Sequence, residues 1–145
     1  MKICFKKSFF LFLILLLTLV FVSCAPSMNS IEGHLEELEM EDELSYQRMP
    51  KSQREEFTEK LEDRYDAKFD SVIVKAFVAD SYNENRTDYK NVTVLEFEKS
   101  SDCKEAAKAL NFALEGEELG ENTVVIRKGK LLFFGNENMI DLILD

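Results

Sequence analysis

The residues that could carry chemistry in this sequence are few and far apart. Cys103 precedes a stretch with helical spacing, and a helix N-terminus can lower the pKa of a thiol and make it reactive. Lys104 is its only nearby base in the sequence, however, and the single histidine, His34, lies in a distant acidic segment. The sequence contains no CxxC motif, no set of zinc ligands and no recognisable Ser, His and Asp combination. We therefore expect Cys103 to be a structural thiol and His34 to be a solvated residue.

Carboxylates are plentiful, but none of them forms a recognisable binding motif. The run from Glu36 to Glu43 could attract divalent cations, yet it lacks the alternating oxygen ligands and the glycine of a calcium loop. The stretch from Asp80 to Asn85 also departs from that loop, because Tyr82 stands where a second ligand should be. The sequence therefore predicts no catalytic residue, no cofactor and no metal.

The N-terminal segment has the pattern of an export signal. Three lysines, Lys2, Lys6 and Lys7, precede an apolar run of 14 residues from Phe9 to Val22, in which only Thr18 is polar. The apolar region of a signal peptide has about 7 to 15 residues, whereas a membrane-spanning helix needs about 20. This length predicts a signal peptide over residues 1–23. A retained, tilted anchor that extends over residues 23–25 is the alternative.

The end of this segment resembles a known sorting motif. Phe21, Val22, Ser23 and Cys24 are similar to the lipobox of bacterial lipoproteins, although Phe21 stands where that family usually has leucine. The resemblance implies that the Cys24 thiol receives diacylglycerol and that a dedicated peptidase cleaves between Ser23 and Cys24. The mature protein would then begin at Cys24 and carry at least two acyl chains, palmitate being a typical one, which together hold a protein firmly on a membrane. We expect it to face outward from the cell membrane.

Charge and cysteine content narrow the function further. The chain of 145 residues has 18 basic and 28 acidic residues, and removal of the three leader lysines leaves 15 against 28, a net charge of about −13. Such a protein is repelled by nucleic acid and by anionic head groups, so a charged partner is expected to be basic. With Cys4 in the leader and Cys24 acylated, Cys103 has no disulfide partner. Stability must then come from an ordinary apolar core.

The mature chain divides by composition into a tether and one domain. Residues 24–50 are acidic and predict a flexible, lipid-attached tether that holds the domain clear of the head groups. Ile31, Leu35 and Leu38 have helical spacing there, but the surrounding like charges oppose a helix. Residues 51–145 are predicted to form a single α+β domain.

Periodicity within residues 51–145 predicts alternating helices and hairpins. A capping box at residues 52–55 begins a helix with Phe57, Leu61, Tyr65 and Phe69 on one face. Residues 71–79 and 92–98 read as strands, and Val72, Val74, Ala76 and Val78 are expected to share one side of the first. Asp102 is expected to cap a second helix that stops at Gly116. Residues 123–127 and 131–134 read as a hairpin around Gly129, and Asn136 caps a short final helix.

This order of elements predicts an α+β fold of two layers. Two hairpins joined by a helix give an antiparallel four-stranded sheet with helices packed on one face. The apolar run from Leu131 to Phe134 is either a strand buried on both faces or an edge strand that adds a second copy or an extended peptide to the sheet.

These patterns favour a membrane-anchored, exported lipoprotein that is not catalytic and acts as a binding or interaction module of the cell envelope. Its partners would be the membrane, through the lipid on Cys24, and an envelope protein or peptide, but no nucleic acid. Two alternatives remain open: a small envelope enzyme that uses carboxylates or Cys103, and a single-pass anchored subunit of a membrane complex.

Overall fold

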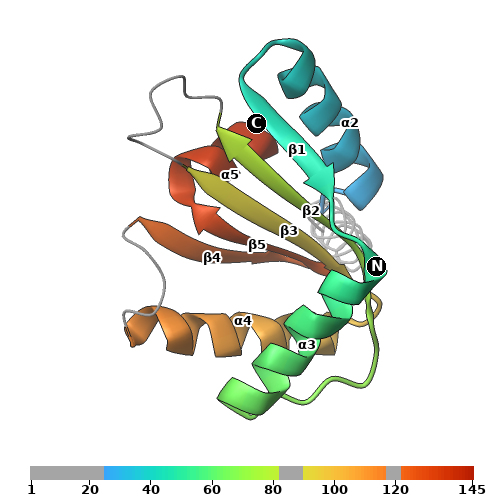
Figure 1. The fold of residues 1–145 in the computed structure, drawn as a ribbon, viewed down its shortest axis with the longest axis vertical. Helices are drawn as coiled ribbons and strands as arrows, with labels where there is room; N and C mark the ends of the chain where they lie inside the picture. Colours follow the sequence, from blue (N-terminus) through green and yellow to red (C-terminus); the bar gives the residue numbers. More distant parts are fainter. Residues whose placement is uncertain (1–24, 82–89, 117–121) are drawn as a thin grey trace, which may run out of the picture.

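The computed structural model describes residues 25–81, 90–116 and 122–145 (Figure 1). The predicted leader, the lipobox residues Phe21, Val22 and Ser23, and Cys24 lie outside the described residues, as does most of the stretch from Asp80 to Asn85. None of the helices in the described part is long and apolar enough to cross a membrane. In chain order the elements are α2 (Met28–Met40), β1 (Leu44–Arg48), α3 (Lys51–Tyr65), β2 (Ile73–Ser81), β3 (Asn91–Phe97), α4 (Ser100–Glu115), β4 (Thr123–Lys128), β5 (Leu131–Asn136) and α5 (Glu137–Leu144).

The strands form one antiparallel sheet in the order β1-β2-β3-β5-β4. The α+β class is confirmed, but the prediction of four strands was wrong, because the segment assigned to the tether supplies a fifth strand, β1. β5 lies between β3 and β4, so the run from Leu131 to Phe134 is an interior strand and not an edge. Leu131, Leu132 and Phe133 are all buried.

Helices cover both faces of the sheet, which corrects the prediction of two layers with helices on one face. α2 and α5 pack on one face, and α3 and α4 pack on the other (Figure 1). The reason lies in the interior strands, whose neighbouring residues are apolar on both sides. In β3, Val94 belongs to the α2–α5 core and Leu95 to the α3–α4 core; in β5, Phe133 and Leu132 divide in the same way. A strand that is apolar on both faces must be covered on both.

The predicted tether is part of the folded domain. Ser27 caps α2 by accepting a hydrogen bond from the Ser30 amide, and the helix buries an apolar stripe against the sheet and α5. The carboxylates that opposed a helix in the sequence lie on its outer side, and Glu32 instead pairs with Arg48 and Lys75. Only Ala25 and Pro26 separate Cys24 from the Ser27 cap. The buried stripe is Met28, Ile31, Leu35 and Leu38.

The helices α3 and α4 each begin closer to the N-terminus than the sequence predicts. α3 begins directly after Pro50, so Ser52 is inside the first turn and does not act as the cap. The helix ends at Tyr65, where Asp66 adopts a left-handed conformation (φ 52°), and Phe69 lies beyond it. α4 begins at Ser100 and not at Asp102.

A bulge in β2 breaks the predicted alternation. The register shifts between Ile73 and Lys75, so that Ile73 and Ala76 both face the α3–α4 core. Val72 and Val74 consequently remain 61% and 45% exposed. The expectation that Val72, Val74, Ala76 and Val78 share one side of the strand was therefore wrong.

The C-terminal predictions are confirmed. Gly129 takes the left-handed conformation that the β4–β5 turn needs, with φ 64°. The Asn136 side chain accepts a hydrogen bond from the Met139 amide and caps α5. α4 ends at Glu115, and Gly116 follows as its C-terminal cap.

Candidate functional site

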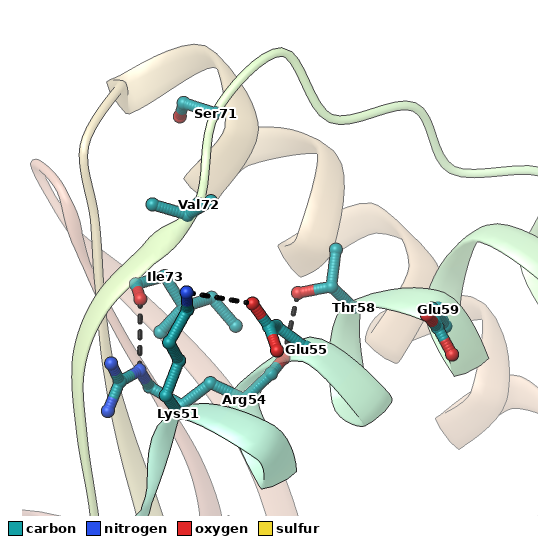
Figure 2. A pocket seen from close by; sticks show the side chains of 8 residues that line it. All are labelled: Lys51, Arg54, Glu55, Thr58, Glu59, Ser71, Val72 and Ile73. Atoms are coloured by element: carbon teal, nitrogen blue, oxygen red, sulfur yellow. Dashed lines mark hydrogen bonds and ion pairs between the residues drawn. The ribbon is translucent and has the colours of Figure 1, made fainter.

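A hollow of about 460 Å³ lies between the first half of α3 and the residues that lead into β2. Because the bulge directs Val72 outward, an apolar side chain stands at its edge, while the buried side chain of Ile73 lies behind it. Figure 2 shows the helix supplying charged and polar side chains on one side and Val72 on the other. The lining residues are Lys51, Arg54, Glu55, Thr58, Glu59, Ser71, Val72 and Ile73.

The polar groups within this hollow hold its walls together. Arg54 donates from Nε to the Ile73 carbonyl at 3.1 Å and from Nη1 to the Met49 carbonyl at 2.8 Å. The Thr58 hydroxyl donates to the Arg54 carbonyl at 2.9 Å (Figure 2). Since a guanidinium bonded to two carbonyls loses freedom, Arg54 fixes α3 against the start of β2. The site is therefore preformed.

Charges of both signs form the rim. Lys51 Nζ lies 3.5 Å from Glu55 Oε1, one turn along α3, and Glu59 follows on the next turn (Figure 2). The pair is exposed and therefore contributes little to stability. A charged ligand can therefore replace the ion pair between Lys51 and Glu55 at a small cost in free energy.

Ser71 is a hydroxyl side chain of the hollow that could act as a nucleophile only with a base to take its proton, and no histidine lies beside it. Its hydroxyl donates to Asp102 Oδ2, and Asp102 Oδ1 accepts from the Asp70 amide at 3.3 Å. Asp102 is buried at the start of α4, so the carboxylate that we expected to cap this helix instead fixes the turn before β2. The only histidine, His34, belongs to α2 on the opposite face of the sheet. This arrangement positions a loop and does not assemble a Ser, His and Asp triad.

Cys103 is buried in the α3–α4 core. Burial raises the pKa of the Cys103 thiol to about 11, although the Arg127 charge acts in the opposite direction. The thiolate is the nucleophilic form of cysteine, and the raised pKa leaves little of it at neutral pH.

His34 is not a solvated residue, contrary to the expectation. Its Nε2 lies 3.1 Å from the Leu142 carbonyl, and its Nδ1 lies 3.6 Å from Glu37 Oε2. The ring therefore joins α2 to α5 at a second hollow of about 310 Å³, which Pro26 and Asp145 also line. No three His, Cys, Asp or Glu side chains within residues 25–81, 90–116 and 122–145 are grouped so as to hold a metal ion.

The acidic residues of α2 protect a free sheet edge. The Tyr46 amide of β1 donates to Glu39 Oε1 at 3.4 Å, and the Tyr46 hydroxyl donates to Glu36 Oε1 at 3.5 Å. Burial, followed by the negative charges of Glu36 and Glu32, raises the pKa of Tyr46. Charged side chains over an edge oppose the addition of another strand. Within the acidic run from Glu36 to Glu43, Glu36 and Glu39 thus bond to β1 and cover the edge of the sheet.

The hollow could not be located from the sequence. Its two walls are separated along the chain, and the exposure of Val72 depends on a bulge that the alternation of residues 71–79 does not reveal. The capping-box pattern at residues 52–55 does predict polar side chains on the first turn of α3. Arg54 and Glu55 of this turn line the hollow, but no side chain caps the helix. No protein-family model, curated protein or solved structure matches this chain.

Proposed function

We propose that this protein is a lipid-anchored, outward-facing module of the cell envelope that binds an extended segment of another protein in the hollow between α3 and β2. The observation that carries this proposal is the exposed Val72 beside a preformed hollow whose internal polar groups, on Arg54, Thr58 and Ser71, are bonded within the protein. An apolar contact surrounded by charged groups favours binding over bond cleavage.

The lining indicates what the bound segment contains. Val72 offers an apolar contact, so the segment needs an apolar side chain at this position. Glu55 and Glu59 occupy successive turns of the rim, and an acidic protein attracts basic partners. We infer that a basic side chain follows the apolar one in the bound segment.

A peptide selection tests this function. A displayed random-peptide library is selected on the membrane-extracted protein, and we expect peptides with adjacent apolar and basic residues. Val72→Asp should weaken their binding at least about tenfold, or ~1.4 kcal/mol, because it places a charge in the apolar contact. Met40→Asp is the matched control, since Met40 is 77% exposed at the end of α2 and should leave binding unchanged.

Other results would contradict the proposal. Selected peptides that bind Val72→Asp as tightly as wild type would exclude the hollow. Turnover of any compound in a panel of ester, peptide and glycoside substrates would instead support the alternative of a small envelope enzyme.

The anchor is tested separately by intact mass. Wild type extracted from membranes should begin at Cys24 with added acyl mass, and Cys24→Ser should keep residues 1–23. If both proteins keep the leader without acyl mass, it is a retained anchor, which supports the alternative of a single-pass subunit of a membrane complex.

A further inference from the structure

We propose that the end of the domain formed by the β4–β5 turn lies directly on an anionic phospholipid surface, a placement that rests on the proposed lipid anchor at Cys24. The basic turn is defined here as Lys99, Arg127, Lys128 and Lys130. Its charges would contact lipid phosphates while the acyl chains hold the protein in the bilayer.

The position of Ala25 brings the anchor to this turn. A Cβ atom built on Gly129 would lie 3.3 Å from the Ala25 Cβ, so Ala25 is packed against the turn. Cys24 is the adjacent residue, and consecutive Cα atoms are about 3.8 Å apart. The lipid on Cys24 would therefore enter the membrane beside Gly129, and the described residues before α2, Ala25 to Ser27, are too few to hold the domain away.

The side chains around Gly129 are basic and exposed. Arg127 Nη1 donates to the Gly129 carbonyl at 3.2 Å and to Ser100 Oγ at 3.3 Å, which fixes the turn against the start of α4. Lys128 and Lys130 flank the glycine, and neither forms an ion pair with any described residue. Two exposed ammonium groups, without an ion pair among the described residues, therefore lie beside Gly129, against which Ala25 packs.

Acidic residues at the same end offset part of these charges. Lys99, at the start of α4, lies 3.9 Å from Asp70, and both side chains are exposed. Glu98 is also exposed, Glu96 is half-buried opposite Leu131, and Asp145 lines a hollow with Pro26. The lysines nevertheless surround the attachment point, where the distance to lipid phosphates is shortest.

The far end of the sheet has the opposite charge. α2 leads away from Ala25 to Met40, and the first pair of β1 and β2, Leu44 with Ser81, marks that end (Figure 1). The described charged residues there are Glu41, Asp42, Glu43, Asp80, Lys90, Glu115 and Glu137. The net charge of about −13 predicts repulsion from anionic lipid. The charges are unevenly distributed, however, and this favours an orientation with the basic turn toward the lipid and the acidic end away from it.

This orientation also places the hollow near the membrane. The Val72 carbonyl accepts a hydrogen bond from the Glu98 amide at 3.3 Å, and Lys99 follows directly. A segment bound against Val72 would thus lie close to the lipid surface. The partner is then expected to present this segment next to its own membrane attachment.

A distance measurement on vesicles tests the orientation. The acylated protein is placed in vesicles of equal parts phosphatidylcholine and phosphatidylglycerol that carry a head-group energy acceptor. Single-cysteine variants Ser101→Cys and Met40→Cys receive a fluorescent donor, and both positions are exposed. Cys103 is buried and Cys24 is acylated, so only the new thiol reacts. The 13 residues of α2 correspond to a difference in height of about 20 Å. We expect efficient transfer from residue 101 and weak transfer from residue 40.

Charge reversal supplies the decisive comparison. Lys128→Glu with Lys130→Glu should reduce the difference between the two labels, and so should molar salt, which shortens the screening length to about 3 Å. The part that remains reflects the anchor beside Gly129. Lys60→Glu with Lys68→Glu changes the net charge equally at exposed positions on and after α3 and should preserve the difference. Circular dichroism verifies that each variant is folded.

The outcomes separate this inference from the proposed function. Anchored protein whose two labels transfer equally overturns the orientation, and a difference left unchanged by reversal of Lys128 and Lys130 overturns the contact of the basic turn with lipid; both results leave the anchor intact. Protein that fails to associate even with vesicles of phosphatidylcholine alone contradicts the lipid anchor and therefore both proposals.

Discussion

Asp102 is a buried carboxylate that connects two segments distant in sequence. It is 3% exposed, and its two oxygens accept from the Asp70 amide and the Ser71 hydroxyl. A buried carboxylate must be hydrogen-bonded to be tolerated, and here its partners belong to the turn that leads into β2. This residue therefore supports the wall of the hollow that carries Ser71 and Val72.

We expect Asp102→Ala to destabilise the protein by roughly 1 to 3 kcal/mol, because the Ser71 hydroxyl and the Asp70 amide lose their acceptor. Urea unfolding measures this change. Asp63→Ala removes an exposed acid from α3 and should change the free energy of unfolding by less than about 0.5 kcal/mol. Equal effects for the two variants would contradict the role of Asp102.

Cys103 predicts a loss of stability at high pH. Its thiol ionises near pH 9.0 in the unfolded chain and near pH 11 in the folded protein. Its contribution is fully present below pH 9 and is lost as the pH rises toward 11, because only the unfolded state then gains by ionising. The fall in the free energy of unfolding across this window should be smaller in Cys103→Ala. If the free energy of unfolding falls equally with pH in wild type and Cys103→Ala, folding does not raise the pKa of this thiol.

At the level of elements, two glycines have opposite roles. Gly135 lies in the interior strand β5 with φ 141°, and a Cβ there would come within 2.3 Å of the Asn91 carbonyl oxygen. Gly33 lies within α2, and nothing is found within 4 Å of its Cβ position. Position 135 therefore requires glycine, whereas glycine at position 33 only lowers the helix propensity of α2.

Alanine substitutions at these glycines should therefore have opposite signs. We expect Gly135→Ala to cost about 3 kcal/mol or more through backbone strain and overpacking. Gly33→Ala should stabilise by about 0.5 to 1 kcal/mol. Thermal unfolding of both variants measures the signs. No gain in Gly33→Ala would contradict the argument that glycine at this exposed position only lowers helix propensity.

Elements whose pattern is local could be predicted from the sequence. The β4–β5 hairpin and the Asn136 cap depend on Gly129 and on side chains close in sequence, and both are confirmed. The spacing of Ile31, Leu35 and Leu38 was visible, but the pairing of Glu32 with Arg48 and Lys75, which fixes α2 to the sheet, is a tertiary contact. The hollow depends on the β2 bulge and on packing of α3, so no local pattern could reveal it.

For the whole molecule, the inclusion of residues 25–50 changes the boundary of the domain. α2 and β1 contribute Met28, Ile31, Leu35, Leu38 and Leu44 to the core that also contains α5. Without them, only α5 would cover that face of β2, β3 and β5, and the part beneath α2 would be exposed to water. The domain is therefore a three-layer unit that starts next to Cys24.

A chain that begins at residue 51 should not fold. Truncation of one buried leucine, isoleucine or methionine costs about 2 to 5 kcal/mol, so removal of five such core residues costs at least as much as the roughly 5 to 15 kcal/mol of stability typical of a domain. We expect no cooperative thermal transition in residues 51–145, whereas residues 25–145 should show one. A cooperative transition in the shorter chain would restore the tether prediction.

The contact between His34 and Leu142 joins residues 108 positions apart. α2 is the first described element in the chain and α5 is the last, so the core between them closes only when nearly the whole chain is present. Contacts this distant in sequence slow folding, since a long loop must close before they form. A chain that crosses a membrane N-terminus first would therefore stay unfolded, and able to be threaded, until its last helix is released on the far side.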